Sequence, residues 1–455
     1  MIFKKKQHFA AALCACALLM PLHALAAEID PDVQAEFDRL VSIGAGDILD
    51  QYLSSLPEDV RNALVEAEEA KYSTTAPEGS DAQTASEDSC GVGLSWTLGE
   101  DGVLTITGDG EIFDFPAAHP APWYAARESI TSVVLGDGVA AIGNLTFADC
   151  VNLAEVTFPE SLSSIGNGAF QNCAALTQVK LPGSLESIGW EAFSGCESLS
   201  WIQVPGTVRF IGGYAFAGCT KLETFAIPES AAAVEMGTFQ GCTQLVDVQF
   251  SQNVTFIGSN AFSGCTQLRM VTLPDSVTEI GIQAFMGCTG LKSVSLSLNL
   301  EKIGAEAFSG CENLSAFAIP GSVCSIGDGA FRGCASLESL ALPEGLTEIG
   351  NYLFYGCKGL RTVVIPETVS RIGRYAFSGC EKLETAAIPA SVLQIESEAF
   401  SYSGVWSVSF RGDAPDIAEN AFRGVQAQAS YPSGAQGWNP KTAVNYGGSL
   451  SWSET

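Results

Sequence analysis

The stretch AFSGCTQLRMVTLPDSVTEIG, residues 261–281, is followed 23 residues later by AFMGCTGLKSVSLSLNLEKIG and, after another 23, by AFSGCENLSAFAIPGSVCSIG. One phenylalanine keeps this spacing along most of the chain. It recurs as Phe147, Phe170, Phe193, Phe216, Phe239, Phe262, Phe285, Phe308, Phe331, Phe354, Phe377 and Phe400, with Phe422 one residue early. A fixed period of this length is the sequence signature of a solenoid made of stacked units.

Each unit contains two short segments that are expected to be extended. The pattern Leu-x-x-Val-x-Leu-Pro predicts a strand that the proline ends, and Ser-Val-x-x-Ile-Gly predicts a second strand followed by a turn. One 23-residue unit has too few apolar side chains to offset the entropy lost on ordering it. Neighbouring units must therefore supply the rest of its core, and we predict a β-rich stack of about twelve units.

Four residues depart from the repeat and are expected to mark local irregularities. Ser251 and Ser297 stand where other units have proline, and Glu235 and Glu396 stand where other units have glycine.

The first 26 residues are predicted to be a secretory signal peptide, residues 1–26. The basic segment MIFKKK precedes an apolar segment, and Ala24-Leu25-Ala26 fits a small-residue cleavage site. A transmembrane anchor is the weaker alternative because the acidic Glu28 follows at once. A lipoprotein box at Leu13-Cys14-Ala15-Cys16 is a further alternative.

Composition changes along the rest of the chain predict five segments. They are an acidic helical segment at 27–73, a flexible linker at 74–89, an N-terminal β cap at 90–129, the solenoid at 130–424 and a C-terminal cap at 425–455. Within the N-terminal cap, LSWTLGEDGVLTITGDGEI alternates apolar and polar residues around glycine turns and predicts a hairpin. No later segment has an apolar run that could span a bilayer, so we expect an exported protein without a transmembrane segment.

The charge of the chain argues against nucleic acid as a partner. The 51 Asp and Glu residues outnumber the 22 Lys and Arg residues, which gives a formal net charge of −29. A surface this acidic repels phosphate backbones.

Eleven of the 15 cysteines share one repeat position, and we predict that they are free and buried. They are Cys150, Cys173, Cys196, Cys219, Cys242, Cys265, Cys288, Cys311, Cys334, Cys357 and Cys380. Equivalent positions in successive units point the same way, so each thiol is expected to act as a small apolar filler rather than a disulfide partner. Metal binding needs convergent ligands, which a linear row without histidine lacks. Cys90 and Cys324 lie outside the row, about eight units apart, too far to pair with each other.

The repeat IGxxAFxGCxxLxxVxLPxSVxx resembles the 23-residue leucine-rich repeat of BspA-like bacterial surface proteins, over about residues 130–424. The flanks CGVGLSWTLGEDGVLTITGDGEIFDF…APWY and SYPSGAQGWNPKTAVNYGGSLSW resemble the terminal segments of members of that family. The resemblance implies a leucine-rich-repeat fold, secretion or surface display, and binding to proteins, other cells or host matrix. No LPxTG-like sorting signal or cell-wall-binding repeat is recognisable, so secretion and surface association both stay open.

Few residues suggest catalysis. After removal of the signal peptide, His119 is the only histidine, and a Ser-His-Asp or Cys-His mechanism would have to use it. The glycine-containing segment 136–141 precedes another repeat strand rather than a long helix, so it does not predict dinucleotide binding. We therefore predict no catalytic site, no cofactor and no metal.

The leading hypothesis is a protein-binding or adhesion module. Residues that flank the central valine of each strand should point outward, because side chains alternate along a strand. Among them Trp201, Gln203, Asp247, Gln249 and Met270 are the side chains best able to anchor a protein or cell-surface ligand, of host or bacterial origin. For Trp201 the alternative is that its ring covers a neighbouring strand. The alternative functions are a structural spacer or a self-associating surface layer, in which segment 27–73 makes the contacts, and an enzyme.

Overall fold

The computed structural model describes residues 89–116, 119–438 and 444–455. The predicted signal peptide, acidic helical segment and linker up to residue 88 lie outside these residues, and the predicted domain limits remain predictions. In the part of the chain that is described, no helix combines the length and apolar character needed to cross a membrane.

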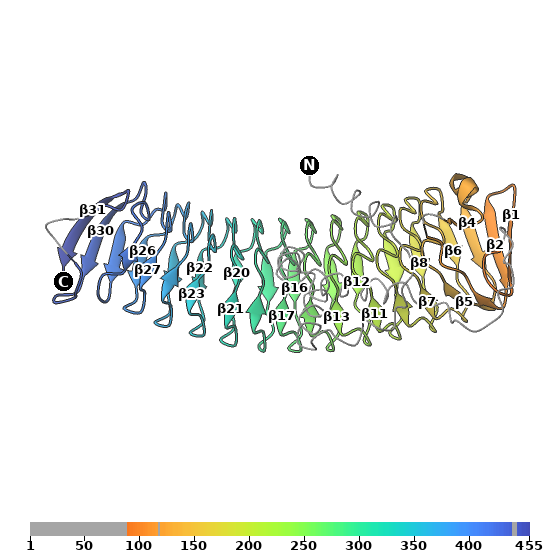
Figure 1. Ribbon diagram of the computed structural model, residues 1–455, viewed down its shortest axis with the longest axis horizontal. Coiled ribbons are helices and arrows are strands. Elements are labelled where there is room, and N and C mark those ends of the chain that lie inside the picture. Colours follow the sequence, from red (N-terminus) through yellow and green to blue (C-terminus); the bar gives the residue numbers. More distant parts are fainter. Residues whose placement is uncertain (1–88, 117–118, 439–443) are drawn as a thin grey trace, which may run out of the picture. The chain divides into compact units, whose positions relative to one another are not determined.

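Two ladders of short strands run through the solenoid, in sequence order from β1 to β31 (Figure 1). The first ladder is built from the Leu-x-x-Val-x-Leu segments. Its strands are β4 (Ser132–Leu135), β6 (Glu155–Thr157), β8 (Gln178–Lys180), β10 (Trp201–Gln203), β12 (Thr224–Ala226), β14 (Asp247–Gln249), β16 (Met270–Thr272), β18 (Ser293–Ser295), β20 (Ala316–Phe317), β22 (Ser339–Ala341), β24 (Thr362–Val364), β26 (Thr385–Ile388), β28 (Ser407–Phe410), β30 (Gln426–Tyr431) and β31 (Ser449–Glu454).

The second ladder is built mainly from the two residues that precede the glycine turn of each unit. Its strands are β3 (Gly110–Glu111), β5 (Val139–Ile142), β7 (Ser164–Ile165), β9 (Ser187–Ile188), β11 (Phe210–Ile211), β13 (Ala233–Val234), β15 (Phe256–Ile257), β17 (Glu279–Ile280), β19 (Lys302–Ile303), β21 (Ser325–Ile326), β23 (Glu348–Ile349), β25 (Arg371–Ile372), β27 (Gln394–Ile395) and β29 (Asp416–Ile417). Paired strands within both ladders are parallel and offset by one repeat, as in Glu279 opposite Lys302. The predicted β-rich solenoid is therefore confirmed.

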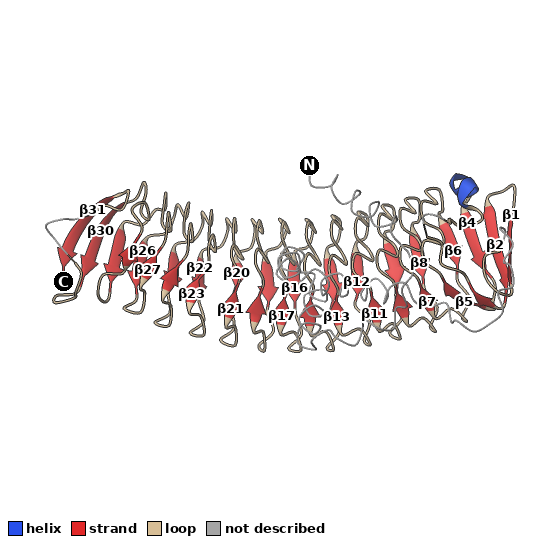
Figure 2. Cartoon of the chain, viewed as in Figure 1, coloured by secondary structure: helices blue, strands red, loops and turns tan. Residues whose placement is uncertain are grey.

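The described N-terminal end differs from the repeats. Strands β1 (Leu94–Leu98) and β2 (Val103–Gly108) form an antiparallel hairpin where one was predicted, and β2 pairs in parallel with β4. In the described residues the helical structure is one 3-10 helix, η2 (Tyr124–Ser129), drawn in blue in Figure 2. Trp123, next to η2, stacks on Phe147 and donates a hydrogen bond from Nε1 to the carbonyl of Thr146 at 3.0 Å.

The repeated phenylalanines form one continuous stack in the core. From Phe147 to Phe422, consecutive ring centroids lie 5.1 to 5.8 Å apart. All of these rings are buried. Each ring therefore gains apolar contact from the unit before it and the unit after it, which is the coupling that a single unit lacks.

The eleven repeated cysteines are free and buried, as predicted. Ten of them also form hydrogen bonds between units, which were not predicted. From Cys173 to Cys380, each thiol donates a hydrogen bond at 3.0–3.3 Å to the carbonyl of the phenylalanine 26 residues earlier. Cys265 Sγ, for example, donates to the carbonyl of Phe239 at 3.2 Å. The cysteine row is thus a row of bonds between units as well as packing. Of the other two described cysteines, Cys90 is buried and Cys324 is exposed.

At two places both ladders are interrupted between the same units. The first joint separates β10 from β12 and β11 from β13, and the second joint separates β20 from β22 and β21 from β23. Next to each joint a phenylalanine, Phe225 or Phe317, takes the position of the central valine. Phe225 lies 5.0 Å from Phe216 and 4.7 Å from Phe239, whose own separation is 5.8 Å. Phe317 contacts Phe308 and Phe331 in the same way, at 5.0 Å each. At both joints the larger ring thus packs against the core phenylalanines of two neighbouring units.

The two glutamates that replace the repeat glycine, Glu235 and Glu396, differ in how they affect the second ladder. A Cβ at Gly281 would lie 2.6 Å from the backbone nitrogen of Ser259, so Gly281 has no room for a side chain unless its neighbours shift. Glu235 directly follows β13, which is not paired with β11 at the first joint, so the irregularity predicted at Glu235 is confirmed. The same prediction for Glu396 is wrong. β25, β27 and β29 are continuous there, and Glu396 N donates to the carbonyl of Ile372 at 2.9 Å.

Candidate partner-binding face

The residues proposed to anchor a partner lie on one exposed face, which we call the strand face. It consists of the outward side chains of β8 to β18, namely Gln178, Lys180, Trp201, Gln203, Thr224, Ala226, Asp247, Gln249, Met270, Thr272, Ser293 and Ser295. In β8, β10, β12, β14 and β16 both outer residues are exposed and the central residue is buried. This alternation arises because the central residue of each strand packs on the phenylalanine stack.

All five predicted anchors are solvent-exposed on this face. The side chain of Met270 is 62% exposed and that of Trp201 is 42% exposed. Among the described residues the indole of Trp201 makes no ring contact or hydrogen bond, although more than half of its surface is covered by its surroundings. The structure brings Asp247, Gln249 and Met270 together on the neighbouring strands β14 and β16. Trp201 and Gln203 stand apart from them across β12, where Thr224 and Ala226 are small.

A hollow that the sequence analysis missed adjoins Gln249. Its volume is about 660 Å³, and its lining includes Gln249, Phe250, Thr272, Asp275, Ser295 and Leu298. The hollow lies where Ser251 and Ser297 replace the proline that ends other strands. The first ladder is also interrupted here between β14 and β16, which bears out the irregularity predicted at Ser251, whereas at Ser297 β18 still pairs with β20. The two serines were therefore the sequence signal that could have located the hollow.

One edge of the hollow is built by Asp275 and the loop after β18. Asp275 Oδ1 accepts a hydrogen bond from Leu298 N at 3.0 Å, and the Asp275 carbonyl accepts one from Asn299 Nδ2 at 2.9 Å. Because its backbone is fixed in this way, Leu298 holds its side chain out, 70% exposed. An exposed leucine above half-buried Phe250 and Leu296 gives the hollow an apolar rim beside polar groups.

The charges on the strand face differ from those farther along the chain. Every ion pair found in the described residues joins groups between Glu279 and Arg423. The carboxylate of Asp247 has no ion pair or side-chain hydrogen bond within the part that the structure describes. An unpaired carboxylate on an exposed face can accept a charged hydrogen bond from a basic group of a partner.

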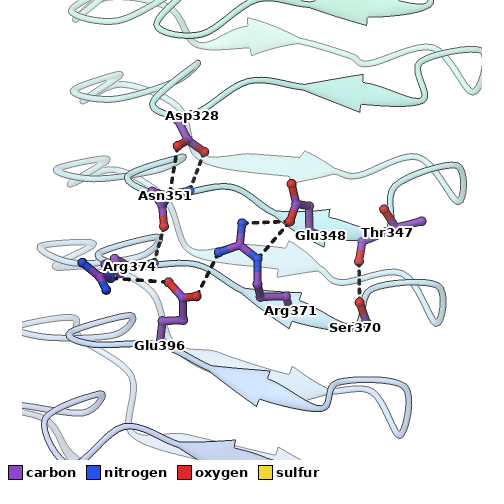
Figure 3. Close-up of polar contacts among 8 residues, drawn as sticks. All are labelled: Asp328, Thr347, Glu348, Asn351, Ser370, Arg371, Arg374 and Glu396. Carbon is purple, nitrogen blue, oxygen red and sulfur yellow. Dashed lines mark hydrogen bonds and ion pairs between the residues drawn. The ribbon is translucent and has the colours of Figure 1, made fainter. Parts of the chain in front are cut away.

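A polar cluster lies farther along the chain, between Asp328 and Glu396 (Figure 3). Arg371 points its guanidinium at Glu348, at 2.8 Å, and at Glu396, at 3.1 Å. Burial favours the neutral form of Arg371, but its hydrogen bonds to Glu348 and Glu396 and their charges raise its pKa above the ordinary value. Asn351 donates to Asp328, and its own side-chain oxygen accepts from Arg374 N. The charged and polar groups of this cluster bond to one another, so we assign it a structural role in linking neighbouring units.

Burial also removes the chemistry that the cysteine row could have offered. It raises the pKa of the thiols of Cys196, Cys242 and Cys288 to about 12. A protonated, buried thiol is neither a nucleophile nor a metal ligand. In the described residues no three His, Cys, Asp or Glu side chains are grouped so as to hold a metal ion.

The two parallel ladders, the buried repeat leucines and the exposed strand face define a leucine-rich-repeat solenoid. The chain belongs to the family described as the BspA type leucine rich repeat region, whose model matches residues 123–242, 209–334 and 301–428. This is a family of bacterial surface proteins.

Solved structures of similar proteins include two from bacteria. A leucine rich cell surface protein from Faecalibacterium prausnitzii is 27% identical, with 74% of this chain and 96% of that chain covered and a TM-score of 0.46. A leucine-rich repeat protein from Bacteroides ovatus is 26% identical, with 66% and 94% covered and a TM-score of 0.45. A comparison with curated proteins gave no match.

Proposed function

We propose that this protein is exported and binds a protein or cell-surface ligand, of host or bacterial origin, through the strand face. Trp201, Gln203, Asp247, Gln249 and Met270 are the proposed anchors. The observation that carries the proposal is their common exposure on one face, beside a hollow with an apolar rim. Trp and Met provide large contact areas at interfaces, and Gln side chains add hydrogen bonds around them.

The chemistry of the face indicates the kind of surface that would fit it. Asp247 and Asp275 favour a basic group on the partner, and Met270 with Leu298 favours an apolar side chain next to it. The proposal includes no catalytic step, cofactor or metal, in keeping with a family of non-enzymatic repeat proteins.

The experiment begins with a pull-down from host and bacterial extracts, with the full secreted protein as bait. The affinity of the captured partner is then measured for the wild type, for Trp201→Ala, and for a triple variant that combines Trp201→Ala, Asp247→Ala and Met270→Ala. We expect Trp201→Ala alone to weaken binding by about 2 kcal/mol or more, with little change in thermal stability. The matched control is Leu393→Ala with Tyr402→Ala, because these side chains are as exposed as the anchors but lie off the strand face. Equal affinity of wild type and the triple variant would exclude this face.

The second candidate function is a spacer or self-associating layer whose contacts are made by segment 27–73. It is supported by the acidic composition of that segment. Deleting residues 28–89 separates the two proposals. Partner binding that survives the deletion supports the strand face, and binding or self-association that is lost with the segment supports the second candidate.

A further inference from the structure

Near the C-terminal end of the described solenoid lies a second hollow, separate from the strand face. Its volume is about 480 Å³, and it is lined by Trp406 and by residues of β30 and β31. Small-ligand sites in proteins typically enclose about 300–1,000 Å³. The hollow is thus large enough for a small ligand, and none of its lining residues belongs to the strand face.

Trp406 contributes an unoccupied aromatic surface to this hollow. Its side chain is 56% exposed, although tryptophan is among the residues with most to gain from burial. In the described residues its ring makes no aromatic or cation–π contact, and its Nε1 has no hydrogen-bond partner. The backbone around it is fixed, since Trp406 N donates to the carbonyl of Glu384 at 3.2 Å and Gln428 N donates to the carbonyl of Trp406 at 2.9 Å.

The floor of the hollow is a strip of neutral polar side chains. Gln426 and Gln428 of β30 are exposed and stand opposite Ser449 and Ser451 of β31 in the strand register. The side chains of these four residues have no hydrogen-bond partner within the described part of the chain. Asn445 completes the polar lining, with its Oδ1 accepting from Leu450 N at 3.3 Å. No lining residue is charged, although the protein as a whole carries a formal charge of −29.

These groups select for one ligand chemistry. Amide and hydroxyl groups can both donate and accept, which matches sugar hydroxyls, whereas carboxylates only accept and guanidinium groups only donate. The C–H face of a pyranose ring can pack on an exposed indole, which a rigid tryptophan offers at low entropic cost. β28 and β30 are each paired on both sides and β31 is the edge strand of this sheet, so a peptide could add a strand only beyond β31 and not over the hollow.

We infer that the hollow at Trp406 is a binding site for a neutral oligosaccharide. The sugar stacks on the Trp406 indole, and its hydroxyls bond to Gln426, Gln428, Ser449 and Ser451. The site is independent of the protein-binding strand face, so one chain can hold a protein partner and a glycan at once.

The test is an array of immobilised neutral, sialylated and sulfated glycans, probed with the full secreted protein. We expect neutral glycans to be bound. On the best of them, Trp406→Ala and Gln428→Ala should each weaken binding by about tenfold or more. Trp406→Phe, which keeps an aromatic face, should lose less than Trp406→Ala.

Two controls make the result specific. Val364→Ala removes an apolar side chain that is 64% exposed on the first ladder but outside the hollow, and it should leave glycan binding unchanged. The Trp201, Asp247 and Met270 triple variant should also keep glycan binding, which separates this site from the proposed protein-binding face. Absence of binding to every glycan, binding confined to sialylated or sulfated glycans, or equal binding by wild type and Trp406→Ala would overturn the inference.

Discussion

At the scale of single residues, the cysteine row shows why this residue type is favoured over another small one. The cysteine position between the phenylalanine stack and the repeat leucine is fully buried from Cys173 to Cys380, where alanine or valine would also be apolar. Cysteine in addition donates to the carbonyl of a phenylalanine in the preceding unit, as Cys288 does to Phe262 at 3.1 Å. The Phe262 carbonyl already accepts from Cys265 N at 3.1 Å, so the thiol of Cys288 is a second donor to it and links two units.

The first prediction concerns the reactivity of these thiols. Of the 13 described cysteines, 12 are buried and Cys324 is exposed. Among these 13 thiols we expect that of Cys324 to react quickly with a thiol-labelling reagent, and the other 12 to react only after denaturation, because burial keeps them protonated and inaccessible. Cys324→Ser should abolish the rapid phase. Rapid labelling of several native thiols would contradict the burial of the row.

The second prediction concerns alkaline pH. The thiols of Cys196, Cys242 and Cys288 have an ordinary pKa of 9.0, and burial raises it to about 12 in the folded chain. The folded state keeps protons that the unfolded state loses, so this contribution to stability is complete below pH 9 and is lost as the pH rises towards 12. Urea unfolding at a series of pH values should show the free energy of unfolding falling across this window. Replacing Cys242 and Cys288 by alanine should reduce the slope, and an unchanged slope would assign the pH dependence to other groups.

At the scale of the strands, the two joints show how one side chain changes the backbone around it. The central residue of a first-ladder strand is most often valine, whereas Phe225 and Phe317 place rings against the core phenylalanines of two neighbouring units. In the described residues Glu235 N and Gly350 N, which follow the joints, lack the ladder bond that Gly258 N makes to the carbonyl of Val234 at 2.7 Å.

The third prediction is that amides at the joints exchange with solvent faster than equivalent amides elsewhere. We expect Glu235 and Gly350 to exchange faster than Gly258 and Gly281, because an amide without a ladder bond needs no opening of the ladder to exchange. Hydrogen exchange followed by mass spectrometry, with fragments that separate these positions, measures the difference. Phe225→Val should slow exchange at Glu235 if the ring is the cause. Equal protection at all four amides would show that the interruptions have no consequence for stability.

At the scale of the whole array, the joints should limit how far a local defect spreads. Phe285 lies between them and stacks on Phe262 at 5.2 Å and on Phe308 at 5.3 Å. As the fourth prediction, Phe285→Ala should cost about 3–5 kcal/mol, since it removes a fully buried ring. Protection should fall in the units from β12 to β21 and change less beyond either joint. Val364→Ala is the exposed control and should have little effect. Loss of protection in one unit alone, or equal loss along the whole array, would contradict this coupling.

The sequence was sufficient to predict the solenoid, the buried phenylalanines and the outward residues of the strand face, because all three follow from a strict period. It was not sufficient for features that depend on how two units meet. The hollow beside Leu298 depends on loops whose conformation is fixed by Asp275, and the site at Trp406 depends on the register between β30 and β31. The irregularity predicted at Glu396 is wrong because its carboxylate forms ion pairs with Arg371 and Arg374, and the sequence does not show that these residues lie close together.

The hydrogen bonds between neighbouring units also affect how the number of repeats can change in evolution. Cys265 donates to Phe239, Cys288 donates to Phe262, and Cys311 donates to Phe285, so each unit presents to the next what it receives from the one before. Unequal recombination that deletes or duplicates one repeat would therefore rejoin matching partners at the seam. The number of repeats can therefore change by mutation, and with it the distance between the strand face and the hollow at Trp406, while the residues of both stay the same.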